Sequence, residues 1–418
     1  MFSSFPRSFT FTRAAVVASL TLSVANAQKM QAKLDGFFDL DKLPTLTTAD
    51  VEAMVETQKF KKNHPYFTWM DEDKQRAIIK KNKFGNVKVG LSIFEGEIPI
   101  EEAVIDFEEG KFEGVTFSIF NRGDGGSISQ EEFQQRFDKL SEFFTTELKK
   151  QPSRREGNIK KGVMTSGHLW RTQRGNAVLV HNVDADKKVE FLRLKLFPAT
   201  TKEGTYKAAL EDRSYATVRK SKLSSNVEKK DGNVYIANLP MVDQGGKGYC
   251  VVASAQRLFE YYGIDCDMHQ LAQLAKSDPN LGTSTLLINR ELGAIDYLFQ
   301  TRFSCLAVAH EGKLVELKDD KYVGKEINEK KAMKIVQSNI DKGIPLLWSL
   351  ELGQAKEEPN LNPQTSGGHM RMIIGYNDKE EKIIFSDSWG KGHAFKTMSY
   401  DDFYRVTKGL FLMVPTSN

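Results

Sequence analysis

The chain has 418 residues, of which 40% are hydrophobic and 27% are charged, as is typical of a soluble globular protein with two or three domains. The formal net charge of +4 is small and is spread along the chain, which argues against a nucleic-acid partner. Three cysteines allow at most one intramolecular disulfide, which excludes a disulfide-rich scaffold.

The first 27 residues contain the three parts of an export signal. Arg7 and Arg13 give a positive start, residues 14–24 form an apolar core too short to span a bilayer, and residues 25–27 are the cleavage motif Ala-Asn-Ala. We therefore predict a signal peptide over 1–27 and a mature protein that is secreted or held in the periplasm or cell envelope. No later segment is apolar enough to cross a bilayer, so we expect no integral membrane segment after signal removal.

The pattern of residues 28–217 predicts an α+β domain of unknown role. Helices are expected over 47–58, which opens with a capping pattern, and over about 71–81. A third, amphipathic helix is expected after Ser129. The predicted strands are 87–94, 102–107, 114–120, 168–171, 177–183 and 189–196.

Residues 121–132 resemble half of a calcium-binding loop. Gly123 and Gly125 stand at loop positions three and five, where they bring no side-chain oxygen, and the preceding segment has the pattern of a strand. A turn followed by a capped helix is therefore the prediction here. The histidines of the chain show no metal-ligand spacing, so we predict neither a metal nor another cofactor.

Residues 218–232 are polar and aperiodic, which predicts a linker. The remaining part, 233–418, has predicted helices first and an antiparallel sheet second, so the fold class is α+β. The expected helices are 250–262, 268–276, 284–298 and 329–342. The expected strands are 303–309, 345–350, 369–376, 382–387 and 409–414.

Cys250 follows a glycine-rich loop and stands at the first position of a predicted helix. The unpaired N–H groups and the dipole of a helix N-terminus favour negative charge, and a thiolate is the form of cysteine that attacks a carbonyl. Gln244 lies six residues earlier and can direct its side-chain amide to the same place. That amide and the Cys250 backbone N–H would form an oxyanion hole with two donors.

His369 begins an apolar predicted strand directly after two glycines, which let the chain approach a site closely. An imidazole that acts as a base needs an acceptor on its other nitrogen. A hairpin turning near residues 378–381 would bring Asp387 beside His369 as that acceptor. Trp389 would cover the hydrogen bond between them and keep water away from it.

These residues form the pattern Gln-x5-Cys, His-x5-Gly-Tyr and Asp-Ser-Trp-Gly, which resembles the papain-like cysteine peptidases over residues 240–415. In that family the fourth motif is Asn-Ser-Trp-Gly. The aspartate in its place is similar to the bacterial double-glycine-leader peptidases, which share the fold, although their transporter membrane segments have no counterpart here. The resemblance therefore points to a stand-alone, exported relative with a papain-like C-terminal domain.

The resemblance implies a thiol peptidase that acts on a protein or peptide substrate. It assigns Gln244 as oxyanion donor, Cys250 as nucleophile, His369 as general base and acid, and Asp387 as the residue that orients the imidazole. Substrate contacts are expected at the loop and strand positions around these residues, namely Gly246, Gly248, Gly368 and Trp389.

Other functions fit the same residues. An amidase or acyl transferase would use the same triad, and a catalytically dead peptidase fold would leave a binding or adhesion role to the N-terminal domain. The N-terminal domain itself has three candidate roles, as an inhibitory pro-segment, a docking or regulatory module, or a cell-surface anchor. Its length favours the docking or regulatory role over a simple pro-segment.

Four further residues have more than one interpretation. Cys266 and Cys305 lie in apolar surroundings and are expected to be a structural pair or buried thiols. Arg371 shares the strand face of His369, where a structural salt bridge is the first expectation and a contact to Asp387 or substrate the second. His393 lies near Trp389 in the sequence and would line the site.

Overall fold

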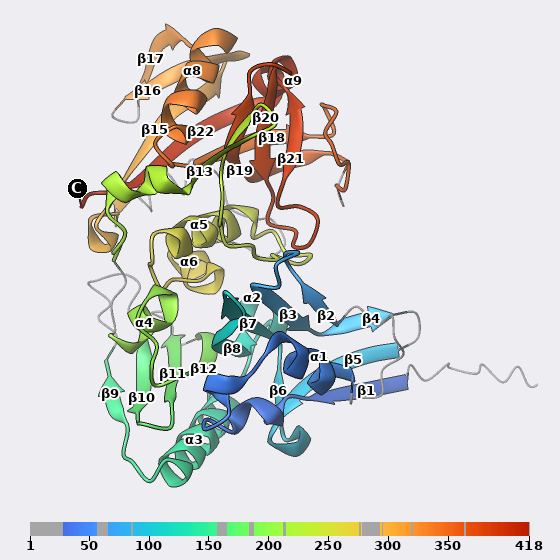
Figure 1. Ribbon diagram of the computed structural model, residues 1–418, viewed down its shortest axis with the longest axis vertical. Coiled ribbons are helices and arrows are strands. Elements are labelled where there is room, and N and C mark those ends of the chain that lie inside the picture. Colours follow the sequence, from blue (N-terminus) through green and yellow to red (C-terminus); the bar gives the residue numbers. More distant parts are fainter. Residues whose placement is uncertain are drawn as a thin grey trace, which may run out of the picture.

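The computed structural model describes the chain in two layered parts, an N-terminal region and a C-terminal region, with helices α5 (Cys250–Tyr261) and α6 (Met268–Leu274) between them (Figure 1). The predicted signal peptide and most of the predicted helix 284–298 lie outside the described residues. Within the described part, no helix combines the length and apolarity needed to cross a membrane. The described residues are 28–56, 66–84, 87–156, 165–183, 188–211, 215–275, 277, 293–294, 296–318, 321–362 and 365–417.

The N-terminal region is built on an eight-stranded antiparallel sheet. Its strands, in spatial order, are β2 (Phe67–Trp69), β3 (Arg76–Lys80), β7 (Glu102–Glu108), β8 (Lys111–Asn121), β12 (Val189–Phe197), β11 (Asn176–Val183), β10 (Ser166–Arg171) and β9 (Ser153–Arg155). A smaller sheet contains β1 (Gln28–Lys33), β5 (Val87–Ile93), β4 (Asn82–Phe84) and β6 (Ile98–Ile100), with β1 and β5 parallel. The helices are α1 (Thr48–Glu56), α2 (Arg122–Gly125), α3 (Gln130–Glu147) and α4 (Gly204–Leu210).

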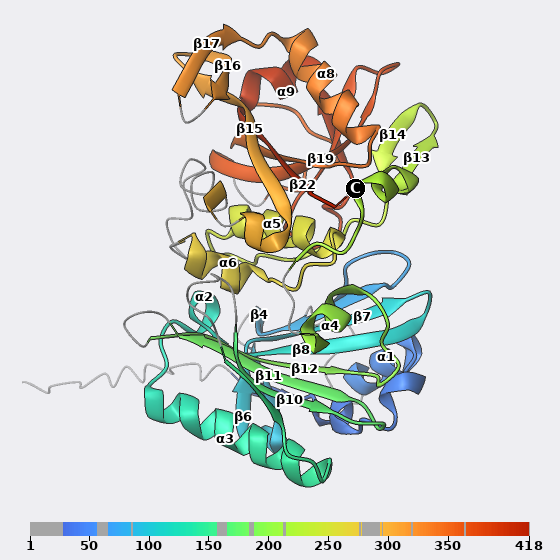
Figure 2. The ribbon, with the colours of Figure 1, turned by 90° about the vertical axis from the view of Figure 1, so that its left-hand side faces the viewer.

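Helix α3 covers one face of the larger sheet, on the side away from α5 and α6 (Figure 2). Ser129 caps it, because its hydroxyl accepts the backbone N–H of Glu132 at 3.1 Å. Its buried stripe of Phe133, Phe137, Leu140 and Phe144 joins the same core as Leu192, Leu194 and Leu196 of β12. The apolar spacing of three and four residues thus predicts which face of the helix is buried.

Strand β12 is buried on both faces, and its residues alternate between two kinds of neighbour. Its leucines face α3, whereas Arg193 and Lys195 point to the opposite side and pair with Asp267 and Asp265, next to α6. A buried cation is stable only when it is paired, so these two positions require an acidic partner on the covering layer. The N-terminal sheet therefore lies between α3 and the α5–α6 layer.

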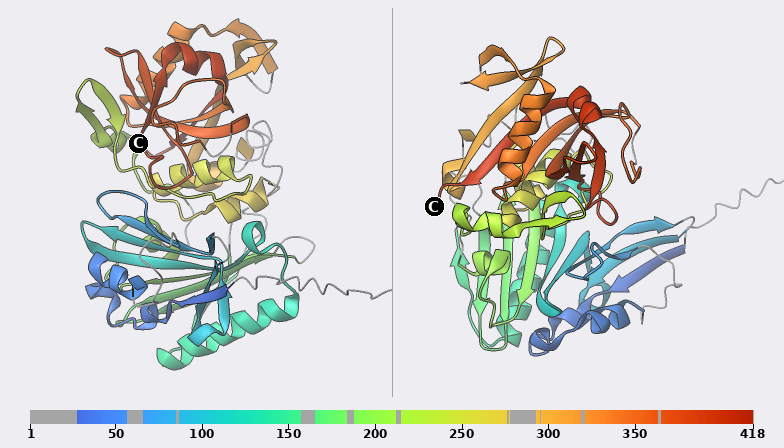
Figure 3. Two further views of the ribbon diagram at one scale, coloured as in Figure 1. Left: turned by 90° about the vertical axis from the view of Figure 1, so that its right-hand side faces the viewer. Right: turned by 45° about the horizontal axis from the view of Figure 1, so that its top comes forward.

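The C-terminal region has a ten-stranded sheet, antiparallel throughout, with α5 packed against β19. The main path is β13 (Val227–Lys230), β14 (Asn233–Ile236), β19 (Gly367–Asn377), β18 (Leu346–Leu352), β22 (Thr407–Pro415), β15 (Thr301–His310), β16 (Lys313–Lys318) and β17 (Lys321–Glu326). Strand β20 (Lys382–Ser386) pairs with β19 and with β21 (Lys396–Ser399). Helices α8 (Glu329–Ile340) and α9 (Tyr400–Val406) complete this part, and Figure 3 shows its position above the N-terminal sheets from two further sides.

The predicted α+β class, with helices before an antiparallel sheet in the C-terminal part, is confirmed. The helix predicted over 71–81 is wrong, because residues 76–80 form β3, which pairs with both β2 and β7. The turn predicted at the start of residues 121–132 contains the short helix α2. Part of the predicted linker, 218–232, is ordered as a 3-10 helix (Lys220–Asn226) and as β13, whose partner β14 joins β19.

Candidate active site

Cys250 is the first residue of α5 and is half-buried. The helix is amphipathic, and its buried residues Ala255, Leu258 and Phe259 belong to the C-terminal core. The loop before it turns at Gly245, whose φ of +70° lies in the left-handed region that glycine adopts without strain. The thiol is thereby fixed at a helix N-terminus, where negative charge is stabilised.

His369 lies near the start of β19, opposite Leu350 of β18, and is buried. Its Nε2 is 2.7 Å from Oδ1 of Asp387, and the Cys250 thiol lies close enough to the imidazole to help raise its pKa. Because Asp387 occupies Nε2, Nδ1 is the nitrogen left to face the sulfur. The structure thus joins three of the residues singled out in the sequence into one chain of contacts.

Asp387 directly follows β20, and the β19–β20 hairpin brings it back to His369 as the sequence predicts. The carboxylate is fully buried and saturated with donors. Oδ1 accepts the His369 ring and, at 2.9 Å, the backbone N–H of Ser388, while Oδ2 accepts Nε of Arg371 at 2.7 Å. Arg257 of α5 donates to the Asp387 carbonyl at 3.0 Å, which ties the nucleophile helix to the same turn.

His369 and Asp387 determine each other's ionisation because their charges are opposite. Burial opposes a charge on the imidazole, but the Asp387 carboxylate and contact with the Cys250 thiol together raise the pKa of His369 to about 9. Burial also opposes a charge on Asp387, yet His369, and then Arg371 and Lys396, hold the pKa of this carboxyl well below its usual range. At neutral pH the pair is therefore imidazolium and carboxylate.

A buried ionic network stands behind Asp387. The Arg371 guanidinium donates to Glu357 at 2.6 Å and to Asn362 at 2.7 Å, in addition to its bond to Asp387. The Lys396 ammonium binds the other oxygen of Glu357 at 3.0 Å. Of the two expectations for Arg371, the structure thus shows both a salt bridge and a contact to Asp387. Two carboxylates and two cations together satisfy one another in a site without solvent.

Trp389 covers the imidazole. Its ring lies on that of His369 with centroids 4.2 Å apart and planes 14° apart. His393 meets the indole edge-on, with ring centroids 5.7 Å apart, and its carbonyl accepts the backbone N–H of Asp387 at 2.8 Å. The expectation that Trp389 shields the His369–Asp387 hydrogen bond agrees with this arrangement, and His393 supports the tryptophan.

Gln244 is buried and held at three points. Its backbone N–H donates to the Ser388 carbonyl at 2.8 Å, and the Ser388 hydroxyl donates to its Oε1 at 2.6 Å. Its Nε2 donates to the Lys247 carbonyl at 3.1 Å. A primary amide carries two N–H donors, so one proton of Nε2 remains for a ligand. These contacts fix the side chain in the orientation that presents nitrogen, not oxygen, to the loop.

The three glycines expected at the substrate site lie beside these residues in the chain. Methyl groups added at Gly246 and Gly368 would meet no atom within 4 Å, so both positions border open space. Gly248 lies in the same loop, two residues before Cys250. Contact of these glycines or of Trp389 with a substrate stays a prediction.

The remaining cysteines are not joined. Cys250, Cys266 and Cys305 are all described by the structure, and no disulfide joins any two of them. The structural pair considered for Cys266 and Cys305 is therefore absent, while the alternative of a buried thiol holds for Cys266. Burial raises the pKa of Cys266, so it is a poor nucleophile.

Several residues of the site escape sequence reasoning. Glu357 and Asn362 come from an irregular segment, where no periodicity predicts which side chains turn inward. Arg257 does carry a signal, because it stands among apolar residues on the buried side of α5, where a charge requires partners. In the described residues, no cluster of three histidine, cysteine or acidic side chains has the arrangement of a metal site.

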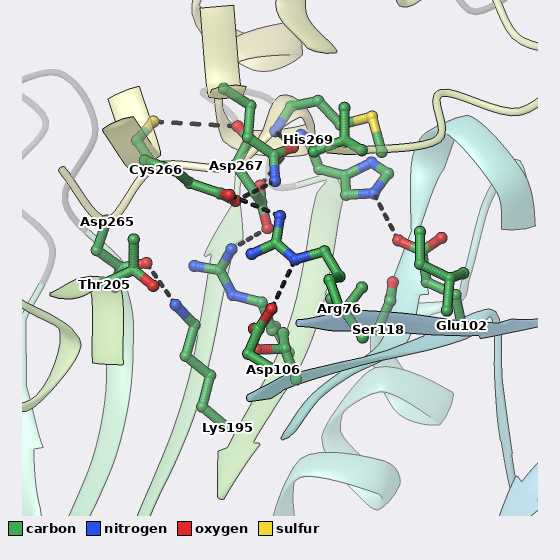
Figure 4. A pocket seen from close by; sticks show the side chains of 18 of the residues that line it. Arg76, Glu102, Asp106, Ser118, Lys195, Thr205, Asp265, Cys266, Asp267 and His269 are labelled. Atoms are coloured by element: carbon green, nitrogen blue, oxygen red, sulfur yellow. Dashed lines mark hydrogen bonds and ion pairs between the residues drawn. The ribbon is translucent and has the colours of Figure 1, made fainter. Parts of the chain in front are cut away.

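A cavity of about 70 Å³ lies between the N-terminal sheet and α6 (Figure 4), and Cys250 is not among the residues that line it. Charged side chains line it and face one another, among them Arg76 with Asp106 and Lys195 with Asp265. A void of this size holds a few water molecules. We interpret it as a hydrated part of the interface between the two regions.

Comparison with known proteins places the C-terminal half in a family. Residues 236–410 match the Peptidase_C39 like family. Among solved structures, xylellain, a cysteine protease from Xylella fastidiosa, is similar at 14% sequence identity and a TM-score of 0.23, over 48% of this chain and 91% of xylellain. No curated protein matches the chain. The family resemblance expected from the motifs is thus confirmed for this domain.

Proposed function

Because residues 236–410 form a Peptidase_C39-like domain, we propose that this domain is an active cysteine peptidase that hydrolyses peptide bonds through a thioester on Cys250. The observation that carries the proposal is the continuous chain of contacts from the Cys250 thiol through His369 to Asp387. A dead peptidase fold has no need to keep His369 and Asp387 buried and paired.

In the first half-reaction the Cys250 thiolate attacks the peptide carbonyl carbon. A C–S bond forms, and the carbonyl electron pair moves to oxygen, where the Cys250 backbone N–H and the remaining Gln244 amide proton stabilise the charge. When the carbonyl re-forms, the C–N bond breaks and the leaving nitrogen takes a proton from the His369 imidazolium. The products are a thioester and a free amine.

In the second half-reaction water attacks the thioester carbon while His369, now neutral, accepts a proton from it. A C–O bond forms, the C–S bond breaks, and the thiolate returns with the protonated imidazole beside it. Asp387 remains ionised throughout, because its role is to hold the ring orientation and stabilise the imidazolium.

We also propose that the protein is exported. The support is the order of positive start, apolar core and Ala-Asn-Ala motif in residues 1–27. Sequencing the N-terminus of the protein recovered outside the cytoplasm tests this, and the expected first residue is Gln28. A chain that keeps its first 27 residues would contradict it.

The peptidase proposal is tested with fluorescein-labelled casein as substrate and with iodoacetamide as thiol probe. Wild type is expected to release fluorescent peptides, Cys250→Ala none, and His369→Ala very few. Peptide mapping identifies the alkylated cysteine, and Cys305→Ala is the matched control because that thiol lies outside the chain of contacts. Cleavage that persists in Cys250→Ala, or a folded wild type without activity on any protein substrate, would contradict the proposal.

A further inference from the structure

The loop that carries Gln244 is held by the N-terminal region at two of its residues. The ammonium group of Lys80, the last residue of β3, forms an ion pair with Asp243. Three residues beyond Gln244, the ammonium of Lys247 binds Asp124 of α2 at 2.6 Å. The two ion pairs thus lie on either side of the glutamine.

The Asp243 contact continues into the site. Its other oxygen accepts the backbone N–H of Gly245 at 2.8 Å, which sets the turn after Gln244. Its backbone pairs with that of Trp389, and the neighbouring Gly390 packs against its side chain. A shift of Asp243 would therefore move the turn that carries Gln244.

The Lys247 contact reaches Gln244 more directly. The Lys247 carbonyl is the acceptor of the Gln244 amide at 3.1 Å, and it also accepts the backbone N–H of Tyr249 at 2.8 Å. Because the Lys247 side chain is anchored on Asp124, the N-terminal region fixes the position of that carbonyl. The orientation of the oxyanion donor thus depends on a residue of the other region.

Helix α2 also packs closely against the loop 243–249. A methyl group added at Gly123 would lie 2.9 Å from the Tyr249 ring and 3.1 Å from the Lys247 side chain. Only a glycine lets the backbone of α2 approach this closely. Asn121 caps the turn, because its side chain accepts the backbone N–H of Asp124 at 2.8 Å.

The interface between the two regions contains further buried ion pairs. Arg76 of β3 pairs with Glu260 of α5 at 2.7 Å, and both side chains are less than 15% exposed, at 14% and 12%. Arg193 and Lys195 bind Asp267 and Asp265 in the same layer (Figure 4). Separation would leave several buried charges without partners, which is costly. A pro-segment that must leave would not be attached in this way.

We propose that the N-terminal region is a permanent part of the catalytic unit, in which Lys80 and Asp124 are positioning residues that hold the oxyanion loop 243–249 in its active shape. The proposal rests on the peptidase function proposed above. It assigns the N-terminal region a supporting role at the active site, in place of inhibition or surface anchoring.

The test separates a reaction that passes through an oxyanion from one that does not. With 4-nitrophenyl acetate, the Cys250 sulfur bonds to the acetyl carbon and 4-nitrophenolate leaves with the electron pair of the broken C–O bond, by way of a tetrahedral oxyanion. With iodoacetamide, sulfur displaces iodide without one. Both rates are measured on full-length protein, with mass mapping to Cys250.

Lys80→Met and Asp124→Asn are each expected to slow acetylation about 10-fold, since complete loss of an oxyanion donor costs about 100-fold or more. Alkylation should stay within about twofold of wild type, because the thiolate and His369 are untouched. Lys80→Arg should restore acetylation, and Gly123→Ala should slow it. Lys195→Met is the matched control, because it breaks a buried ion pair between the regions that does not touch the loop.

If acetylation and alkylation slow equally in Lys80→Met and Asp124→Asn, the variants are generally destabilised and the proposal is overturned. Slower acetylation with unchanged alkylation in Lys195→Met would overturn it as well. Hydrogen exchange of residues 243–249 provides a reading independent of chemistry, and faster exchange in Lys80→Met and Asp124→Asn is expected. Unchanged exchange overturns the positioning role even if wild type cleaves casein. If the two variants exchange faster but wild type does not cleave casein, the positioning role is supported and the peptidase function is contradicted.

Discussion

The indole of Trp389 lies nearly parallel to the imidazole of His369, with ring centroids 4.2 Å apart, so that one face of this histidine is closed to water. A hydrogen bond between charged groups weakens when solvent reaches it. The stack therefore protects the His369–Asp387 pair as well as fixing the plane of the ring.

Replacing Trp389 tests this protection. Trp389→Ala should lower kcat on labelled casein by about 10-fold, because the ring loses its support and water reaches the ion pair. Trp389→Phe keeps an aromatic face and should retain most of the activity. Equal losses in the two variants would show that the indole itself, and not an aromatic cover, is needed.

Gln244→Ala should separate oxyanion stabilisation from the reactivity of the Cys250 thiol. Loss of one oxyanion donor is expected to lower kcat on casein by about 100- to 1000-fold, while alkylation of Cys250 by iodoacetamide proceeds at the wild-type rate. Ser388→Ala removes only the hydroxyl that holds Oε1 of Gln244, so its effect should be smaller, about 10-fold. A loss of alkylation in Gln244→Ala would mean that the glutamine supports the thiolate instead.

The ionisation of His369 predicts an alkaline limit to activity. In the proposed mechanism the imidazolium protonates the leaving amine, so kcat should fall as pH rises through the pKa of His369, about 9. Asp387→Asn removes the negative charge that raises this pKa, so the fall should move to lower pH, toward the ordinary value of 6.5. Rates on casein from pH 5 to about pH 10 measure it, with circular dichroism at each pH as the control for folding. A limb that stays near pH 9 in Asp387→Asn would exclude the carboxylate as its cause.

The sequence locates the candidate catalytic residues because each lies in a local motif. Cys250 is placed by a loop-to-helix transition, and Asp387 by a hairpin whose two strands follow each other directly in the chain. Such features are set by neighbours in sequence, so periodicity and turn residues are enough to locate them. The same reasoning fails at residues 71–81, where pairing with β2 and β7 overrides a helical pattern.

The contacts between the two regions could not be predicted from the sequence. The alternation of Leu192, Arg193, Leu194 and Lys195 shows a strand with one charged face, which is normally a solvated face. Only the folded chain shows that Asp265 and Asp267 cover it, about 70 residues later. Lys80 and Asp124 likewise lack any motif, because their effect on Gln244 depends on packing between distant segments.

Arg371 should be essential for stability. Arg371→Met would leave Oδ2 of Asp387 and one oxygen of Glu357 buried without their partner, at a cost of about 3–5 kcal/mol in the free energy of unfolding. Urea denaturation followed by tryptophan fluorescence measures it. Lys313→Met is the control, because its ion pair with Glu326 is exposed and screened by solvent and should contribute little. Similar small effects in both variants would show that the buried network relaxes or hydrates.

The interface between the two regions should weaken in acid. Burial opposes the charge of Asp265, but Lys195 and Arg193 hold the pKa of this carboxyl below its ordinary value of 3.8. Since the folded-state pKa is depressed, the stabilisation is present above pH 3.8 and is lost as pH falls through the lower folded value.

Asp265→Asn removes the stabilisation by the Asp265 carboxylate at every pH. The variant should be less stable than wild type at pH 7 by about 3–5 kcal/mol, because Lys195 stays buried without a carboxylate. The difference between the two proteins should narrow as the pH is lowered from about 4 to about 2, where wild type protonates the same group. Thermal unfolding at each pH, with Asp39→Asn as an exposed control beside Lys42, measures the gap. A gap that stays constant over this range would show that Asp265 keeps its charge, and that acid opens the interface, if at all, through another carboxylate.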